Sequence, residues 1–599
     1  IINENLDALG IYKKAARQAG LVEKVSSTLA AFKQQGISPQ ELGQAAEGLP
    51  EGSTLFKIND LVLLYQKFND YMQGRYLDTE DRVNLFINKM GESNYIKQAR
   101  IWIDGFTTYS GQSLRIIEKL MGLARETTIS FTINNEDDPD SDLFHLSARS
   151  YRKIRSMAQA CGIREEVVHF ASGGAGNGKD PELEFLEKEL YAYPYRVYRR
   201  EVNHIRLFAS TNVQAEVENA AREVTGLARE KGYRWKDIAV VCNNMETYGD
   251  LLSRTFASYG IPVFMDGKRS IMTNPLVQLI LSALEVLEYD FRPEDVFRLM
   301  KTGLNNISPE ACEQLENYAL QYGLIGGKWR KPLVRGEESW RAELEPERLA
   351  LVEPLQVLGA KTRGLRPCTE MNQALYEFLQ ELEVESKLAL WIESLNRAGE
   401  YARASENTQI WNIVMGILDQ LEEFMGDQEM NLKDYSKVLE AGFVTYEVGL
   451  IPTTVDQVLV GDIQRSKSHD IKALLVLGAN DGVLPSAHEE EELLSAVEKE
   501  LLQEKGLDLG YTREKQFQEE RFLIYSALGK PCDYLLLSWS LADREGKAMR
   551  PSMLVDRLQK LLPAIKTTSD LTNTNIELDK INTPASTFNN LVNSLRDIV

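Results

Sequence analysis

Two kinds of hydrophobic periodicity alternate along this chain and separate helical segments from α/β segments. Up to about residue 95, apolar residues recur every three or four positions, as Leu61 and Leu64 do, and this spacing predicts an all-helical unit. Residues 99–106, 113–126 and 127–133 then have the patterns of a strand, a helix and a second strand. This order predicts a parallel sheet.

A second α/β segment begins near residue 204 and is interrupted by a helical block. Its first strands are expected at 204–210, 237–242 and 261–266, with helices at 215–232 and 246–260. Gly232 and Gly260 stand at the ends of these helices, where a left-handed residue is favoured. From about residue 285 to 440 the spacing is helical only. Strand patterns resume at 453–463, 473–479 and 533–540, so we expect both halves to build one sheet.

Composition places the chain among globular proteins, because 43% of its 599 residues are hydrophobic and 26% are charged. The sequence has no run of about 18 apolar residues and no signal-peptide pattern, so we expect a cytoplasmic protein. It begins without Met inside a helical pattern, which suggests a piece of a longer protein. Five dispersed cysteines predict neither a disulfide framework nor a metal cluster in this stretch: Cys161, Cys242, Cys312, Cys368 and Cys532.

The net charge of -21 limits how nucleic acid could bind. Phosphate binding draws its affinity from Lys and Arg, so DNA would have to run through a local basic channel. Composition alone favours the alternative, an acidic protein that does not touch nucleic acid.

A glycine-rich stretch at 173–180 has the spacing of a phosphate loop, G-x-x-x-x-G-K, and follows a strand-like segment at 165–172. A phosphate loop needs Ser or Thr after its Lys to bind Mg²⁺, and the Lys must lie at the helix N-terminus. Here Asp180 follows Lys179, and the Asp-Pro pair predicts a helix that starts after the lysine. We therefore interpret 171–180 as a flexible linker.

Asp104 is a second candidate for a nucleotide site, because it ends the expected strand 99–106 where a carboxylate could hold Mg²⁺. Hydrolysis also needs a base or water-positioning carboxylate, which Asp-Glu helicase motifs place on the next residue. This chain has Gly105 there. The alternative is an ordinary aspartate in a turn, and the sequence predicts no active ATPase centre in either case.

Two later segments resemble superfamily 1 helicase motifs. Residues 464–468 (QRSKS) precede a strand pattern that ends in Gly-x-x-x-Gly-x-x-Pro at 471–485, similar to the motif that grips single-stranded DNA. Residues 519–530 resemble the last motif, Glu-Glu-Arg-x-Leu-x-Tyr-x-x-x-Thr-Arg, whose final arginine contacts the γ-phosphate. Gly529 and Lys530 replace that Thr-Arg, and Lys cannot make the bidentate guanidinium contact. The bland alternatives are a basic turn before a buried strand and a plain amphipathic helix.

Taken in order along the chain, six segments resemble the AddB family: 75–86, 101–106, 237–248, 259–287, 476–485, and 522–528 with 551–558. The resemblance implies the second subunit of a helicase/deoxyribonuclease that processes broken DNA ends for recombination, a heterodimer with an AddA-type subunit, and no membrane partner. It also implies ATP, Mg²⁺ and an iron–sulfur cluster for the full-length family, bound outside this stretch. Within this chain, Asp104, Arg521 and Lys530 would be remnants of a nucleotide pocket.

Three groups of residues are candidates for single-stranded DNA binding. Arg465 and Lys467 lie in the helicase-like turn, and Lys268 and Arg269 follow the expected strand 261–266. These basic pairs would neutralise phosphates at sheet edges, or alternatively pair with nearby carboxylates. The segment YAYPYRVYRRE at 191–201 interleaves tyrosines and arginines, and Tyr195 with Arg196 represents its capacity for base stacking and phosphate contact. The alternative is an inter-domain linker whose rings pack on their neighbours.

The sequence therefore predicts an α/β fold of two RecA-like parallel-sheet domains of superfamily 1 helicase type, each with a helical insertion. The expected division is a helical insertion at 1–95, the rest of the first domain and linker at 96–200, the second domain at 201–285 and 441–560, its insertion at 286–440, and a following segment at 561–599. The predicted function is an ATPase-inactive scaffold that channels and scans single-stranded DNA. The rivals are an active DNA translocase and a protein-interaction scaffold without DNA contact.

Overall fold

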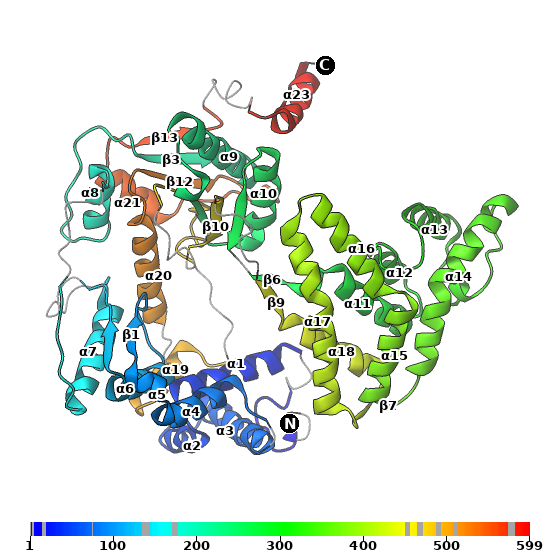
Figure 1. Cartoon of the computed structure of the whole chain (residues 1–599), viewed down its shortest axis with the longest axis horizontal. Coiled ribbons are helices and arrows are strands. Elements are labelled where there is room, and N and C mark those ends of the chain that lie inside the picture. Colours follow the sequence, from blue (N-terminus) through cyan, green and yellow to red (C-terminus); the bar gives the residue numbers. More distant parts are fainter. Residues whose placement is uncertain are drawn as a thin grey trace. The chain divides into compact units, whose positions relative to one another are not determined.

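The structure, a computed structural model, divides into two compact units (Figure 1). Unit 1 comprises Ile1–Val263 and Asp456–Val599, and unit 2 comprises Phe264–Val455. The residues described are 2, 5–14, 19–74, 76–133, 143–169, 178–266, 268–449, 456–463, 471–486, 493–507, 509, 513–572 and 582–598.

Helices form the first hundred residues of unit 1, as the periodicity predicts. They are α1 (Ala19–Gln35), α2 (Pro39–Glu47), α3 (Ser53–Met72), α4 (Thr79–Lys89), the 3₁₀ turn η2 (Met90–Glu92) and α5 (Asn94–Gln98). Asp60 of α3, which is 4% exposed, ties the preceding segment to this core. Its carboxylate accepts the backbone N–H groups of Gly10 at 2.8 Å, Ile11 at 2.9 Å and Tyr12 at 3.0 Å.

A distant helix completes this N-terminal core. Helix α19 (Ala496–Glu504) buries Leu502 among the apolar residues of α1 to α3. Its Glu498 closes a capping box with Ser495 and forms an ion pair with Lys57 of α3 at 3.1 Å. The helical core of unit 1 is therefore assembled from both of its chain segments.

The predicted strand-helix-strand segment folds as expected. Strand β1 (Arg100–Ile103) pairs in parallel with β2 (Glu126–Ile129), with Ile101 opposite Thr127 and Ile103 opposite Ile129. Helix α6 (Gly111–Leu123) connects them and buries Leu114 and Ile117. In the described part of the chain this sheet has two strands.

A seven-stranded sheet dominates the rest of unit 1, in the order β13-β3-β12-β11-β4-β10-β5. The strands are β3 (Ile205–Ser210), β4 (Ile238–Cys242), β5 (Val263–Asp266), β10 (Val458–Asp462), β11 (Ala473–Leu477), β12 (Tyr534–Ser540) and β13 (Lys566–Ser569). The six strands from β13 to β10 run parallel. Strands from the two chain segments of unit 1 are interleaved in the sheet, so segments far apart in sequence lie side by side (Figure 1). The prediction of one interrupted sheet is confirmed.

Amphipathic helices cover this sheet or extend from it. Helix α9 (Val213–Glu230) follows β3, and α10 (Met245–Ser258) follows β4. Gly232 and Gly260, just beyond them, have φ values of 68°, as the sequence predicts. The remaining elements of unit 1 are α7 (His145–Ala160), α8 (Pro181–Glu189), η3 (Trp235–Asp237), α20 (Arg513–Leu528), α21 (Met553–Leu561) and α23 (Pro584–Ile598).

One strand expectation is wrong. The strand-like segment 165–172 has no strand in its described part, 165–169, where Val167 and Val168 are 42% and 66% exposed. Valines favour a strand only when neighbouring strands and a core accept them, and these two have neither. The edge strand β13 was not expected, because its sequence KTTS is polar.

Unit 2 is mainly helical around one apolar core. Its helices are α11 (Pro275–Glu288), α12 (Pro293–Met300), α13 (Pro309–Tyr322), α14 (Glu338–Lys361), α15 (Cys368–Glu381), α16 (Val384–Arg397), α17 (Tyr401–Met425) and α18 (Leu432–Val444), with the 3₁₀ turns η4 (Ile271–Thr273) and η5 (Gly326–Arg330). Two short antiparallel pairs accompany them: β6 (Lys268–Ser270) with β9 (Glu447–Gly449), and β7 (Arg366–Pro367) with β8 (Glu429–Met430). Core residues come from all of these helices, for example Ile280, Leu355 and Phe443.

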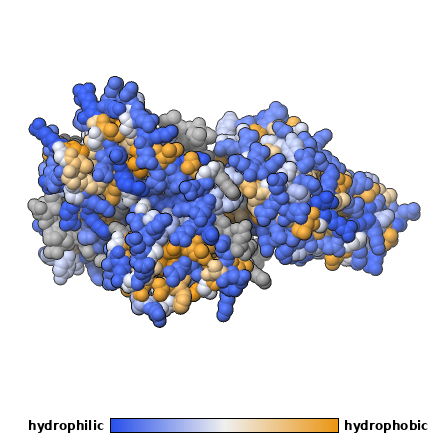
Figure 2. All heavy atoms as spheres, turned by 90° about the horizontal axis from the view of Figure 1, so that it is seen from below, coloured by the Kyte–Doolittle hydropathy of each residue, from blue (hydrophilic) through white to orange (hydrophobic). Residues whose placement is uncertain are grey.

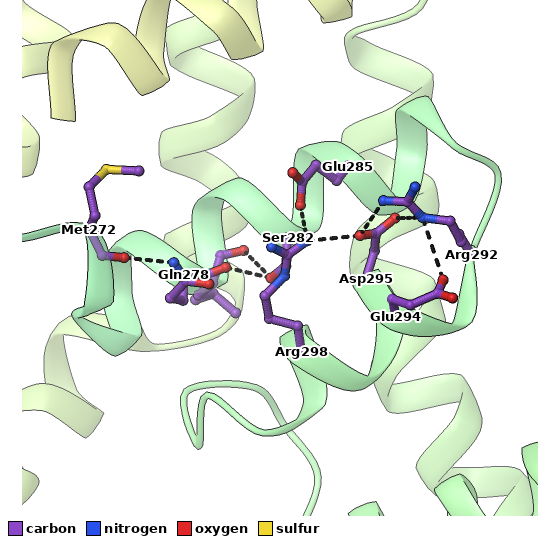
Figure 3. A network of polar contacts seen from close by, with 9 residues as sticks. Met272, Gln278, Ser282, Glu285, Arg292, Glu294, Asp295 and Arg298 are labelled. Atoms are coloured by element: carbon purple, nitrogen blue, oxygen red, sulfur yellow. Dashed lines mark hydrogen bonds and ion pairs between the residues drawn. The ribbon is translucent and has the colours of Figure 1, made fainter. Parts of the chain in front are cut away.

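A buried carboxylate fixes the turn between α11 and α12 (Figure 3). Asp295 is fully buried and accepts from Arg292 at 2.9 and 3.0 Å and from Arg298 at 2.8 Å. Arg298 also contacts Glu285, whose pKa is raised by burial. The buried charge is thus compensated by two arginines that remain partly in solvent.

The surface of the molecule seen in Figure 2 is mainly hydrophilic, as expected of a chain in which 26% of the residues are charged. Hydrophilic residues cover most of the face in Figure 2, with smaller apolar patches between them. Among the described residues, no helix is long and apolar enough to cross a membrane.

Candidate nucleic-acid interface

The carboxyl ends of β4, β11 and β12 form the central part of one edge of the seven-stranded sheet. Ligands of open parallel sheets bind outside this edge, where the loops after the strands diverge. A cavity of about 300 Å³ lies here. Each loop contributes to its lining: Asn244 after β4, Gly478 and Asn480 after β11, and Ser540 at the end of β12.

A buried carboxylate, Glu216 of α9, links the residue after β11 with strand β12 and helix α10 at this edge. Glu216 is fully buried and accepts hydrogen bonds from the Gly478 backbone N–H at 2.8 Å, the Ser538 hydroxyl at 2.6 Å and the Tyr248 hydroxyl at 2.7 Å. Burial raises its pKa above the ordinary value of 4.5, against the lowering effect of the three donors. Gly478 has a φ of 69°, and a Cβ there would lie 3.1 Å from the Tyr248 ring. Only glycine therefore fits between the strand end and this ring.

Asn480 makes the second buried polar link at this edge, and it is 1% exposed. Its amide nitrogen donates to the Ser540 carbonyl at 2.7 Å and the Arg550 carbonyl at 3.1 Å, while its amide oxygen accepts from the Ser540 N–H at 3.2 Å. One side chain therefore fixes the loop after β11 to both ends of the loop after β12.

The loop after β12 is a short hairpin with basic residues on its surface. Ala542 and Ala548 form an antiparallel bridge, and Asp543 accepts the backbone N–H groups of Glu545 at 3.0 Å and Lys547 at 2.9 Å. Arg544, Lys547 and Arg550 are all exposed on it. Of these cations Arg544 lines the cavity, together with Asp543 and Glu545, while Lys547 and Arg550 lie elsewhere on the hairpin.

The phosphate-loop candidate takes part in structural contacts. Asp180 is the N-cap of α8 and accepts from the Glu182 N–H, with Pro181 in the first turn, which confirms the predicted helix start. The Lys179 ammonium contacts Glu187 and donates to the Gly529 carbonyl at 2.5 Å. A lysine neutralised before the helix and an aspartate in place of a hydroxyl do not fit bound Mg²⁺-nucleotide. The preceding residues 173–177 lie outside the described part of the chain.

Asp104 directly follows β1, and its carboxylate accepts a hydrogen bond from Ser130, just after β2. Gly105 has a φ of 80°. A glutamate would be strained in this left-handed conformation, so the backbone does not suit the Asp-Glu pair of active helicases.

The helicase-like segment of α20 contacts three other parts of unit 1. Glu519 accepts from Thr108, after β1, at 3.1 Å, and Glu520 accepts from the backbone N–H of Ser486, after β11. The Arg521 guanidinium lies 4.8 Å from the ring centre of Tyr191 and 5.6 Å from that of Phe517. Lys530 lies in the turn beyond the helix, next to the carbonyl that Lys179 binds. Asp104 thus contacts Ser130, Arg521 contacts two aromatic rings, and Lys530 lies beside the Gly529 carbonyl. The contacts described do not join these three residues in one nucleotide pocket.

The tyrosine-rich segment 191–200 differs from ring to ring. Tyr191 lies against Arg521, and burial raises its pKa to about 12. Tyr195 lies under the Arg557 guanidinium at 4.3 Å, and Tyr198 packs on Phe185 at 5.1 Å. Tyr193 is 96% exposed, and the Arg196 side chain is 86% exposed. Tyr191, Tyr195 and Tyr198 therefore pack on neighbouring residues, as expected of a linker. Tyr193 and Arg196 are exposed and remain candidates for DNA contact.

The remaining DNA-binding candidates are less well defined. Arg465 and Lys467 lie outside the described residues. Lys268 and Arg269 lie in β6, opposite Gly449 and Val448 of β9, in a small sheet separate from the seven-stranded one. The structure describes only the backbone of these two residues, so DNA binding by their side chains stays a prediction.

Glu216 and Asn480 were not among the site residues predicted from the sequence, and Tyr193 was included only as one of the tyrosines of 191–201. For Glu216 a signal existed, because a glutamate interrupts the apolar stripe that Val213, Val217 and Ala220 form on α9. For Asn480 the sequence gives no comparable signal.

Comparison with known proteins bears on the whole chain. The family description "ADDB, N-terminal" matches residues 1–187. A protein from Alkaliphilus oremlandii, named as the second subunit of an ATP-dependent helicase/deoxyribonuclease, is 43% identical across 100% of this chain and 54% of its own length. Proteins of the same name from Alkaliphilus metalliredigens and Clostridium botulinum (strain Loch Maree) are 41% and 35% identical over the same shares. The chain belongs to the AddB family.

This AddB-family chain spans about half the length of the curated relatives it matches, 54% of each of the three. The family description covers the N-terminal helices and the β1–β2 pair, whereas the relatives also align with the seven-stranded sheet and unit 2. Among the described residues no group of three His, Cys, Asp or Glu side chains could hold a metal ion, and all five cysteines are free thiols.

Proposed function

We propose that this chain is the helicase-like part of a DNA end-processing helicase/deoxyribonuclease that acts in the repair of double-strand breaks by recombination. In this proposal its two α/β parts are RecA-like domains of superfamily 1 type with helical insertions. They hold and scan single-stranded DNA without hydrolysing ATP. An AddA-type partner supplies the motor, in the cytoplasm.

The observation that carries this proposal is the contact between the two helicase-like segments. Glu520, in the segment that resembles the last helicase motif, binds the backbone of Ser486, which directly follows the segment that resembles the DNA-gripping motif. The two segments resemble helicase motifs independently in sequence, and the contact lies in the loop after β11, on the carboxyl edge where parallel sheets bind ligands. The same edge carries the basic hairpin with Arg544, Lys547 and Arg550.

The lack of ATP hydrolysis is supported by three local features. Lys179 and Asp180 take part in structural contacts, Gly105 stands where a catalytic carboxylate would be needed, and Arg521 lies between two aromatic rings. We therefore expect the purified chain, with single-stranded DNA and Mg²⁺-ATP, to release phosphate no faster than the protein-free control. Turnover above this background that disappears in Asp104→Ala would contradict the proposal and favour an active translocase.

DNA binding is tested through its dependence on salt. If Arg465 and Lys467 neutralise phosphates, the double alanine variant should bind all single-stranded sequences more weakly. The slope of log affinity against log salt should flatten by roughly 0.7 to 1 unit per lost contact. The measurement is fluorescence anisotropy of a labelled oligothymidylate at several salt concentrations.

A matched control removes the same charge elsewhere. Arg397 and Arg403 form surface ion pairs with Glu393 and Glu400 of unit 2, and their double alanine variant should keep the wild-type slope. An unchanged slope in the Arg465 and Lys467 variant would show that these residues serve nearby carboxylates. Absence of binding by the wild-type chain would favour the protein-interaction scaffold.

A further inference from the structure

Of the four tyrosines between α8 and β3, Tyr193 is far more exposed than Tyr195, which is 39% exposed, and Tyr191 and Tyr198 are half-buried. Tyr191, Tyr195 and Tyr198 are each packed against Arg521, Arg557 or Phe185. Tyr193 lies between them and is 96% exposed. Both faces of a ring this exposed can be reached by an external partner.

The backbone around Tyr193 is fixed. Arg557 of α21 donates to the carbonyls of Glu189 at 2.9 Å, Leu190 at 2.7 Å and Ala192 at 3.0 Å, so it grips the chain directly before Tyr193. The same guanidinium lies 4.3 Å from the Tyr195 ring centre, directly after it. Arg557 therefore contacts the chain on both sides of Tyr193, before it and after it, and leaves the Tyr193 ring exposed.

Two further contacts fix the following residues. The Arg196 N–H donates to the Glu189 carboxylate at 2.8 Å, and the Tyr198 N–H donates to the Leu561 carbonyl at 2.8 Å. The Arg196 side chain is 86% exposed, with its guanidinium 3.9 Å from the Glu189 carboxylate, and Arg199 and Arg200 are exposed as well. A fixed, exposed ring is thus followed within seven residues by three exposed guanidinium groups.

We infer that Tyr193 is a stacking platform for an unpaired base of single-stranded DNA, and that Arg196, Arg199 and Arg200 contact the adjacent phosphates. A base in a duplex has both faces covered by its neighbours, so the geometry suits a single strand. Stacking on an aromatic ring is tolerant of sequence, because every base has a π-face. This inference rests on the proposed function. It assigns the stacking role to Tyr193, whereas the site residue named from the sequence was Tyr195, whose ring has Arg557 on one face.

The decisive experiment measures binding of labelled oligothymidylate to the whole chain by fluorescence anisotropy. Tyr193→Ala should weaken binding roughly 10-fold, which corresponds to about 1.4 kcal/mol, because one base loses the ring on which it stacks. Tyr193→Trp should bind at least as tightly as the wild type, in contrast to Tyr193→Ala, because the larger indole ring offers a larger stacking face. The control Tyr401→Ala removes another exposed tyrosine, 56% exposed on the unit 2 surface, and should bind as the wild type does.

The arginines have a separate readout. Replacing Arg196, Arg199 and Arg200 by Gln should flatten the salt slope by roughly 0.7 unit for each lost phosphate contact, whereas Tyr193→Ala should leave the slope unchanged. Because all four side chains are exposed, the melting temperature should stay at the wild-type value in every variant.

The outcomes distinguish this inference from the proposed function. Wild-type affinity in Tyr193→Ala, with intact binding by the wild-type chain, would overturn the Tyr193 platform alone. Failure of Tyr193→Trp to recover the loss would overturn stacking as its cause. Absence of single-stranded DNA binding by the wild-type chain would overturn the proposed function and the platform together.

Discussion

Replacing Glu216 by alanine is expected to lower the free energy of unfolding by about 4 kcal/mol, because three buried donors lose this acceptor at roughly 1–3 kcal/mol each. The donors are the Gly478 N–H and the hydroxyls of Ser538 and Tyr248, all facing the fully buried carboxyl group. The Ser538 hydroxyl keeps a weaker acceptor, the Val476 carbonyl at 3.3 Å, so its share lies at the low end of that range. Urea denaturation at constant pH measures the change. A loss below about 1 kcal/mol, the size of an ordinary surface substitution, would show that water replaces the carboxyl group without cost.

The matched control is Glu216→Gln, which keeps the shape and one acceptor oxygen. Burial raises the pKa of Glu216 in the folded protein above 4.5, so folding favours the protonated carboxyl group. Its stabilising contribution is therefore complete below pH 4.5 and is lost as the pH rises through the raised pKa. Glutamine does not titrate, so the stability deficit of Glu216→Gln relative to wild type should shrink as the pH is raised from 4.5. A deficit that grows over this range would mean that the carboxyl group is folded in its charged form.

Asn480→Asp should destabilise the chain more than Asn480→Ala does, although aspartate has nearly the same shape as asparagine. Alanine removes the three hydrogen bonds that Asn480 makes with Ser540 and Arg550, at a cost of about 3 kcal/mol, although the Arg550 carbonyl keeps the Asp481 N–H as a donor at 2.9 Å. A carboxylate would keep the bond from the Ser540 N–H and would point a buried charge at the two carbonyl oxygens.

The titration of the introduced aspartate separates charge from shape. Its charged form is disfavoured by burial and by the two carbonyl oxygens, so its pKa in the folded state is raised. The stability of Asn480→Asp should therefore recover as the pH is lowered, while that of Asn480→Ala follows the wild type. Equal urea midpoints for both variants at every pH would contradict this account of the buried link.

Local pattern was enough to predict much of the fold. Apolar runs such as 473–477 and 534–540 are fully buried, so continuous hydrophobicity identified the central strands. The polar strand β13 escaped this test because its residues are exposed or half-buried and it is defined by its pairing with β3. Val167 and Val168 failed in the opposite sense, since their preference for a strand found no neighbour.

The candidate site depended more on tertiary contacts. Tyr191, Tyr193, Tyr195 and Tyr198 are equivalent in a composition argument, and the arginines that cover two of them lie hundreds of residues later in α20 and α21. The Asp180 cap was predictable because it depends on neighbours in sequence. The Asn480 network was not, because its partners are backbone atoms brought together by the sheet.

The sheet interleaves strands made early and late in synthesis, and this order constrains when the protein can fold. In the seven-stranded sheet, β3, β4 and β5 are not neighbours of one another, and each pairs with strands from β10 onward. A nascent chain that has emerged only as far as unit 2 therefore holds three strands without native pairing partners, two of them strongly apolar. Unit 2 is continuous in sequence and forms its own core before those partners are made. The ribosome must thus release nearly the whole stretch up to Ser540 before β3 can close its ladder with β12, and until then its exposed edges are open to aggregation or to chaperone binding.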